Sequence, residues 1–140
     1  MKIITVAAIV LWAFPANAQE QYLGMAVDNP AEFIQETLQC PKKAVLQGVP
    51  ENQAACQLTD RMFGFETHGG KLWIFLVIWT DELAFLAAYL DIARKYGSPS
   101  HTNHATDTET YQITGTEDFV MVDKDDITMT WISKAAAPAQ

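Results

Sequence analysis

The most regular apolar pattern in this chain lies between Lys71 and Pro99. Residues 72–79 are eight consecutive apolar residues, so both faces of a strand over this range would be apolar. A strand with one solvated face would instead alternate apolar and polar residues. The pattern therefore predicts a strand that is covered on both faces, or one whose second face meets a partner.

A helix is predicted directly after this strand, over residues 81–96. Residues 80–82 (Thr-Asp-Glu) supply a capping side chain and acids that suit the positive end of a helix dipole. Gly97 is typical of the position after a helix, and Pro99 blocks continuation. The acids also argue against a membrane span through this strand and helix, because each central acid costs about 2.5–3.5 kcal/mol.

Weaker patterns on either side predict the remaining elements. A short helix is expected over residues 31–39, after Asn29 as a cap and Pro30 at its first position, and a loop over 42–55. A strand over 57–66 is expected to form a hairpin with the central strand through a turn that contains Gly69 and Gly70. After a polar loop over 98–110, further short strands are expected over residues 111–114, 119–123 and 127–133.

The predicted fold is α+β with the element order αββαββ. Residues 19–134 would form one domain, with an antiparallel four- to five-stranded sheet and helices on one face. Residues 135–140, which are small and include a proline, are expected to be a disordered tail.

The first eighteen residues have the pattern of a secretory signal peptide. Lys2 precedes an apolar run, Pro15 interrupts it, and residues 16–18 (Ala-Asn-Ala) form a small-x-small cleavage site. We therefore expect an exported chain that begins at Gln19, located in the periplasm or outside the cell. The alternative is an N-terminal core helix.

The expected mature chain is strongly acidic. Without Lys2 it has eight basic and seventeen acidic residues, a net charge of −9. No stretch is rich in Lys or Arg, which argues against nucleic acids and anionic membrane surfaces as partners. A basic protein or a cation remains compatible, and so does a charge that serves only solubility.

Cys40 and Cys56 are the only cysteines of the chain. Export would place them in a compartment that permits disulfides. A bond between them would close a loop of fifteen intervening residues and stabilise the fold by about 3 kcal/mol. Two separate buried thiols are the alternative, and the C-x-x-C spacing of a redox pair is absent.

The candidate chemistry is limited to one polar loop. His101, His104 and Asp107 are residue types that bind divalent transition metals, although a solvated loop would have the same composition. The Gly-x-Ser-x-Gly motif is absent and both cysteines are assigned to a bond, so no catalytic residue is predicted. A non-enzymatic protein is favoured, with no cofactor unless the loop binds a metal.

Apolar side chains are more numerous than one two-layer domain obviously needs. The 82–96 helix has two adjacent stripes: one contains Leu83, Leu86 and Leu90, and the other contains Phe85 and Tyr89. Either the first helix and the loops cover this surface, or an exposed part of it binds a protein or a second copy. The candidate partner-binding residues are Trp73, Phe75, Trp79, Phe85, Tyr89 and Trp131.

The predicted function is therefore that of a small exported module that binds a protein partner or self-associates through an apolar-aromatic surface. The alternative is a periplasmic protein that binds a metal or small ligand through His101, His104 and Asp107.

Overall fold

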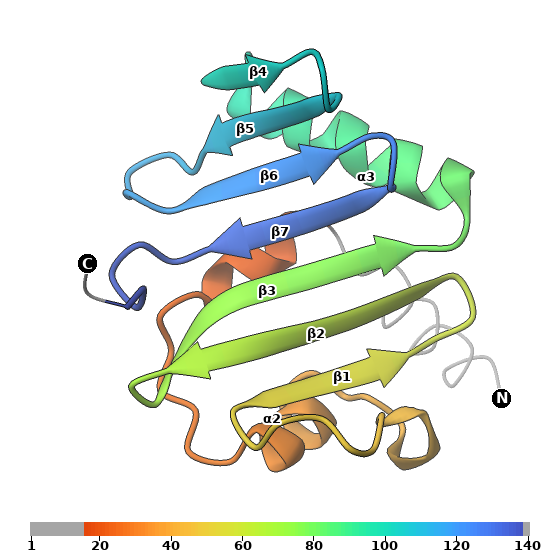
Figure 1. Ribbon diagram of the computed structural model, residues 1–140, viewed down its shortest axis with the longest axis vertical. Helices are drawn as coiled ribbons and strands as arrows, with labels where there is room; N and C mark the ends of the chain where they lie inside the picture. The colour runs from red at the N-terminus through yellow and green to blue at the C-terminus, as the bar shows by residue number, and fades with distance from the viewer. Residues whose placement is uncertain (1–15, 139–140) are drawn as a thin grey trace, which may run out of the picture.

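The computed structural model describes residues 16–138, which contain a single antiparallel sheet of seven strands (Figure 1). The strand order is β1-β2-β3-β7-β6-β5-β4. In chain order the elements are η1 (Ala16–Tyr22), α2 (Pro30–Glu36), η2 (Lys42–Ala44), β1 (Gln53–Gln57), β2 (Arg61–His68), β3 (Lys71–Trp79), α3 (Glu82–Tyr96), β4 (His101–Asn103), β5 (Thr108–Gln112), β6 (Phe119–Asp123) and β7 (Thr128–Ile132). The predicted αββαββ order with a four- to five-stranded sheet was wrong, although the class remains roughly α+β.

Strand β3 is an interior strand, next to the central strand β7, and pairs antiparallel with β2 on one side and β7 on the other. Phe75, Val77 and Trp79 are buried, whereas the alternating residues between them are only half-buried. Near the start of β3 the pairing shifts, because Thr67 faces Leu72 while Glu66 faces Ile74. Trp73 is therefore the extra residue of a β-bulge.

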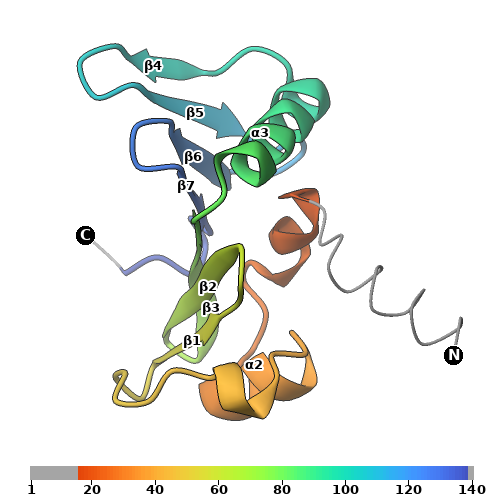
Figure 2. The same ribbon diagram turned by 90° about the vertical axis from the view of Figure 1, so that its right-hand side faces the viewer.

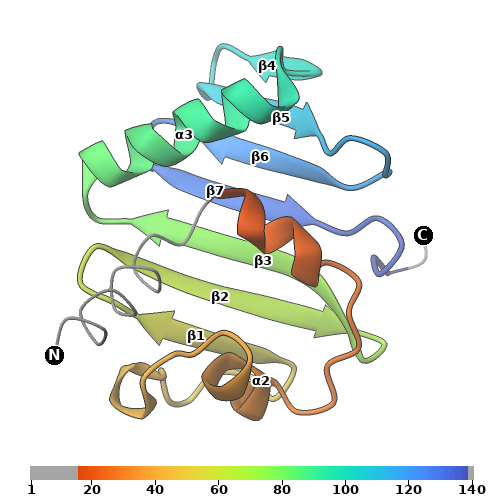
Figure 3. The same cartoon turned by 180° about the vertical axis from the view of Figure 1, so that it is seen from behind.

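The described helices lie on one side of the sheet, and the opposite side carries none of them (Figures 2 and 3). Figure 3 shows α3 in front of the β5–β7 half, η1 in front of the centre and α2 beside β1. The core fills the space between these helices and the inward side chains of the strands. Its largest fully buried side chains include Trp131, Tyr111, Phe75, Ile34, Leu72 and Ile92.

Helix α3 agrees closely with its prediction. Asp81 is the N-cap, and its side chain accepts a hydrogen bond from the backbone N–H of Leu83. Gly97 follows the last turn with a φ of 78°, a conformation that glycine adopts without steric cost. In the same way, Asn29 caps α2 by accepting from the N–H of Glu32, and Pro30 occupies its first turn.

The strands that the prediction missed are polar or short. Strand β1 begins inside the predicted 42–55 loop, and its inward residues are only Ala54 and Cys56. Strand β4 and the start of β5 lie inside the predicted 98–110 loop. On β5 the inward position 109 is a glutamate, so the hydrophobic alternation that normally marks a half-buried strand is absent.

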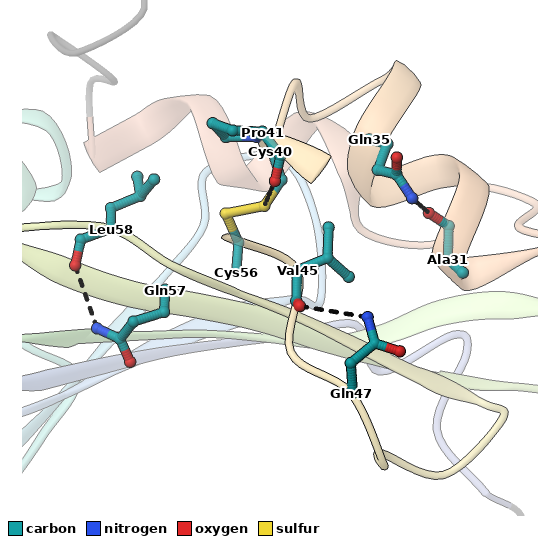
Figure 4. The surroundings of a disulfide bond; sticks show 9 residues. All are labelled: Ala31, Gln35, Cys40, Pro41, Val45, Gln47, Cys56, Gln57 and Leu58. Carbon is teal, nitrogen blue, oxygen red and sulfur yellow. Dashed lines mark hydrogen bonds between the residues drawn. A yellow bond between two sulfur atoms is a disulfide. The ribbon is translucent and has the colours of Figure 1, made fainter. Parts of the chain in front are cut away.

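The predicted disulfide between Cys40 and Cys56 is present, and both residues are buried (Figure 4). It joins the segment after α2 to the edge strand β1, whose outer side is also covered in part by Val45 and Leu46. Val45 pairs with Cys56, and the N–H of Leu46 donates to the carbonyl of Ala55. The edge is thus shielded from pairing with other chains.

Most of the predicted signal segment, residues 1–15, lies outside the described residues. At the other end the chain forms a turn after β7 where disorder was expected from residue 135, and Ala136 is buried. No helix within residues 16–138 is long and apolar enough to cross a membrane.

Candidate interaction surface

Four of the six predicted partner-binding residues belong to the core. Phe75, Trp79, Phe85 and Trp131 are all buried, so they offer no surface to a partner. Phe75, Trp79 and Trp131 lie on the side of β3 and β7 that faces the helices, and Phe85 lies on the buried side of α3. Trp79 and Phe85 pack edge-on at 5.7 Å, which joins β3 to the start of α3.

The other two predicted residues are half-buried. Trp73, at the bulge, packs edge-on against the ring of His68 at 6.1 Å. Tyr89 stacks on Phe85 with parallel rings and donates a hydrogen bond from its hydroxyl to Glu109 at 2.8 Å. The aromatic face proposed from the sequence therefore does not exist as one exposed patch.

The exposed apolar surface lies instead on the outer side of α3. Leu83, Leu86 and Leu90 are 76%, 47% and 50% exposed, and we call these three residues the leucine stripe. Their spacing of three and four residues places them along one side of the helix. Ala87, also exposed, lies between them.

Helix α3 turns its Phe85/Tyr89 side toward the sheet, whereas a contact surface formed by these two residues would have to face outward. Phe85, Ala88 and Ile92 are the buried residues of the helix. The two stripes predicted from the sequence are thus both real, but the aromatic one packs on the sheet and the leucine one faces outward.

Polar contacts at two points fix this orientation. At the middle of α3, Tyr89 donates to Glu109, which also accepts from the hydroxyl of Tyr111 and from Lys124 at 3.2 Å. At its end, both Lys95 and Tyr96 bind the carboxylate of Glu20 in η1. Desolvation and the hydrogen bond to Glu20 raise the pKa of Tyr96, so its hydroxyl stays a donor at neutral pH.

The carboxylate of Glu109 is a stabilising group whose effect depends on pH. Burial by itself opposes its ionisation, but hydrogen bonds from Tyr111, Tyr89 and Lys124 outweigh that effect and lower the pKa of Glu109. A carboxyl with a depressed pKa contributes stability at neutral pH that is lost as the pH falls through the folded-state pKa.

We therefore expect the wild-type free energy of unfolding to fall more steeply than that of Glu109→Gln between about pH 5 and pH 3. Urea unfolding at intervals of half a pH unit measures both curves. Glu117→Gln, on an exposed side chain, serves as the control and should follow the wild type. Parallel curves for the wild type and Glu109→Gln would contradict the proposed contribution of Glu109.

The predicted metal ligands do not form a centre. His101 is exposed on β4, His104 is exposed in the following turn, and Asp107 makes an ion pair with Lys124 at 3.2 Å. Within residues 16–138, no group of three or more His, Cys, Asp or Glu side chains is arranged to hold a metal ion.

The helix-free face of the sheet is a second apolar surface, which the sequence prediction did not separate from the core. Its central residues are half-buried and come from four strands: Met62, Ile74, Leu76, Ile78, Met121 and Ile132. A hollow of about 330 Å³ lies beside Gly64, lined by residues of β1, β2 and β3. Glycine is needed there, because a Cβ atom would lie 2.8 Å from the carbonyl oxygen of Ala54.

No family model, curated protein or solved structure matches this chain. Its function is therefore inferred from the geometry of its own residues.

Proposed function

We propose that this chain is a small exported, non-enzymatic module that associates with a protein through the leucine stripe of α3. The observation that carries the proposal is the exposure of Leu83, Leu86 and Leu90 on a helix whose other apolar side is fully used by the core. Clustered exposed leucines are costly in water and are typical of contact surfaces. The disulfide supports export, since such bonds persist in oxidising compartments.

The size of the stripe sets the strength of the contact. Fully burying a leucine side chain is worth about 1.5–3 kcal/mol, and these three are already partly covered. Their burial therefore supplies about 3 kcal/mol in total. A micromolar complex needs about 8 kcal/mol, so the residues that flank the stripe must contribute as well.

A photo-activated cross-linking side chain at Leu86 tests the proposal in cells that express the chain naturally. We expect an adduct with a protein, either another protein or a second copy, at position 86. The control position is Glu117, whose side chain is 82% exposed and which lies on the β5–β6 loop. No adduct is expected there. Mass spectrometry of the same material should show a chain that begins at Gln19.

The variant Leu83→Gln/Leu86→Gln/Leu90→Gln provides the matched test with purified protein. Glutamine has a high helix propensity and these positions are exposed, so folding is expected to be retained. An apolar dye that binds the wild type should bind this variant several-fold less. Equal adduct yields at positions 86 and 117, or equal dye binding, would overturn the proposal, and a chain that keeps Met1 would overturn export.

A further inference from the structure

We propose that the partner at the leucine stripe is a second copy of this chain, with the two α3 helices packed antiparallel. This inference rests on the proposed function and names the occupant of the same surface. It is carried by the distribution of charge along α3, by the spacing of its outer residues, and by a small residue at the middle of the stripe.

The two ends of α3 carry opposite charges. Asp81 and Glu82 lie at its start, and Arg94 and Lys95 lie in its last turn. In an antiparallel pair, the acidic start of each helix lies beside the basic end of the other, and the helix dipoles also oppose favourably. A parallel pair would instead place acids beside acids and bases beside bases.

The charge balance of the helix also fits a second copy. The chain as a whole carries a net charge of −8, so two random surfaces of two copies repel each other. Arg94 adds a positive charge at the end of α3, whereas Lys95 is already paired with Glu20 of the same chain. Arg94 is 75% exposed and pairs within its own chain with Asp91 at 3.0 Å, a surface ion pair of little strength. Its guanidinium group is available to a neighbouring copy.

The spacing of the outer residues permits close packing of two such helices. Leu83 and Leu90 are seven residues apart and Leu86 lies between them, which is the heptad pattern of helices that pack side by side. Ala87 is exposed at the middle of the leucine stripe, where its small side chain allows the backbones to approach. A two-fold axis that passes near Ala87 would bring the leucine stripes of both copies into one contact.

Single cysteines introduced on α3 test both the contact and its direction. The native cysteines are already paired, so an added cysteine is the only free thiol. A two-fold axis near residue 87 brings the two copies of that position together. The two copies of position 83 would lie about 12 Å apart along the helices, at about 1.5 Å per residue, beyond the reach of a disulfide.

We expect Ala87→Cys to form a covalent dimer under mild oxidation at least ten-fold faster than Leu83→Cys or the exposed control Glu117→Cys. A mixture of Leu83→Cys and Leu90→Cys should give the mixed dimer. Faster self-linking of Leu83→Cys than of Ala87→Cys would overturn the antiparallel arrangement.

Sedimentation equilibrium of the wild type is expected to show a monomer–dimer equilibrium that the triple glutamine variant lacks. A wild type that stays monomeric up to millimolar concentration would overturn the second-copy inference. If the wild type stays monomeric but position 86 cross-links to another protein, the proposed function stands and only the second-copy inference fails. If position 86 gives no adduct, the proposed function and the second-copy inference both fail.

Discussion

Replacing Phe75 with alanine is expected to lower the free energy of unfolding by about 3–5 kcal/mol. Phe75 is 0% exposed at the centre of the interior strand β3. Its ring lies within 6.3 Å of the ring centroids of Tyr22, Phe63 and Trp131, which come from η1, β2 and β7. Truncation leaves a cavity where these elements meet, and aromatic rings cannot rearrange enough to fill it. Urea unfolding followed by far-ultraviolet circular dichroism measures the change.

The neighbouring residue on the opposite face provides the control. Ile74 lies next to Phe75 on β3 but is only half-buried on the helix-free side. Ile74→Ala removes apolar contact without opening a closed cavity, so its cost is expected to be less than half that of Phe75→Ala. Equal costs would show that the helix-free face is as tightly packed as the core, contrary to the structure.

Removing the disulfide with Cys40→Ala/Cys56→Ala is expected to destabilise the chain by about 3 kcal/mol. The bond closes a loop with a sequence separation of 16 and thereby limits the unfolded chain. It also holds the seven-residue helix α2, which is too short to be stable alone, close to β1. When the bond is removed, the packing of Phe33 against Phe65, whose ring centroids are 5.4 Å apart, is expected to loosen.

Urea unfolding with and without reducing agent measures this effect. Reduction should lower the midpoint of the wild type to near that of the double variant and leave the variant unchanged. Hydrogen exchange should increase mainly in α2 and β1, since the α3 side of the sheet has its own packing. A wild type whose midpoint is insensitive to full reduction would contradict the assigned role of the bond.

Local patterns were sufficient to predict part of the fold. The β3–α3 unit follows from a continuous apolar run, a capping aspartate and a terminal glycine, all of which act over a few residues. The hairpin between β2 and β3 follows from Gly69 and Gly70, which both adopt positive φ. These features depend on the backbone preferences of a few adjacent residues, so the local sequence is enough to predict them.

The number of strands could not be predicted in the same way. Strands β1, β4 and β5 are held by backbone hydrogen bonds to the strands next to them in the chain, while their side chains give little apolar alternation. The inward glutamate of β5 is tolerated only because Tyr89, Tyr111 and Lys124 donate to it. Tyr89 and Lys124 lie 20 and 15 residues away from Glu109 in sequence, so a local pattern of residues does not reveal that its carboxylate has these hydrogen-bond donors.

The leucine stripe shows how far prediction from the sequence reaches. The residues of this segment are enough to predict that α3 forms, where it begins and ends, and that it has two apolar stripes. Which stripe is exposed depends on contacts with the rest of the chain, because both are apolar and either could have packed on the sheet. The choice depends on the aromatic contact of Phe85 with Trp79 and on the carboxylates of Glu20 and Glu109, which bind one side of the helix from distant parts of the chain.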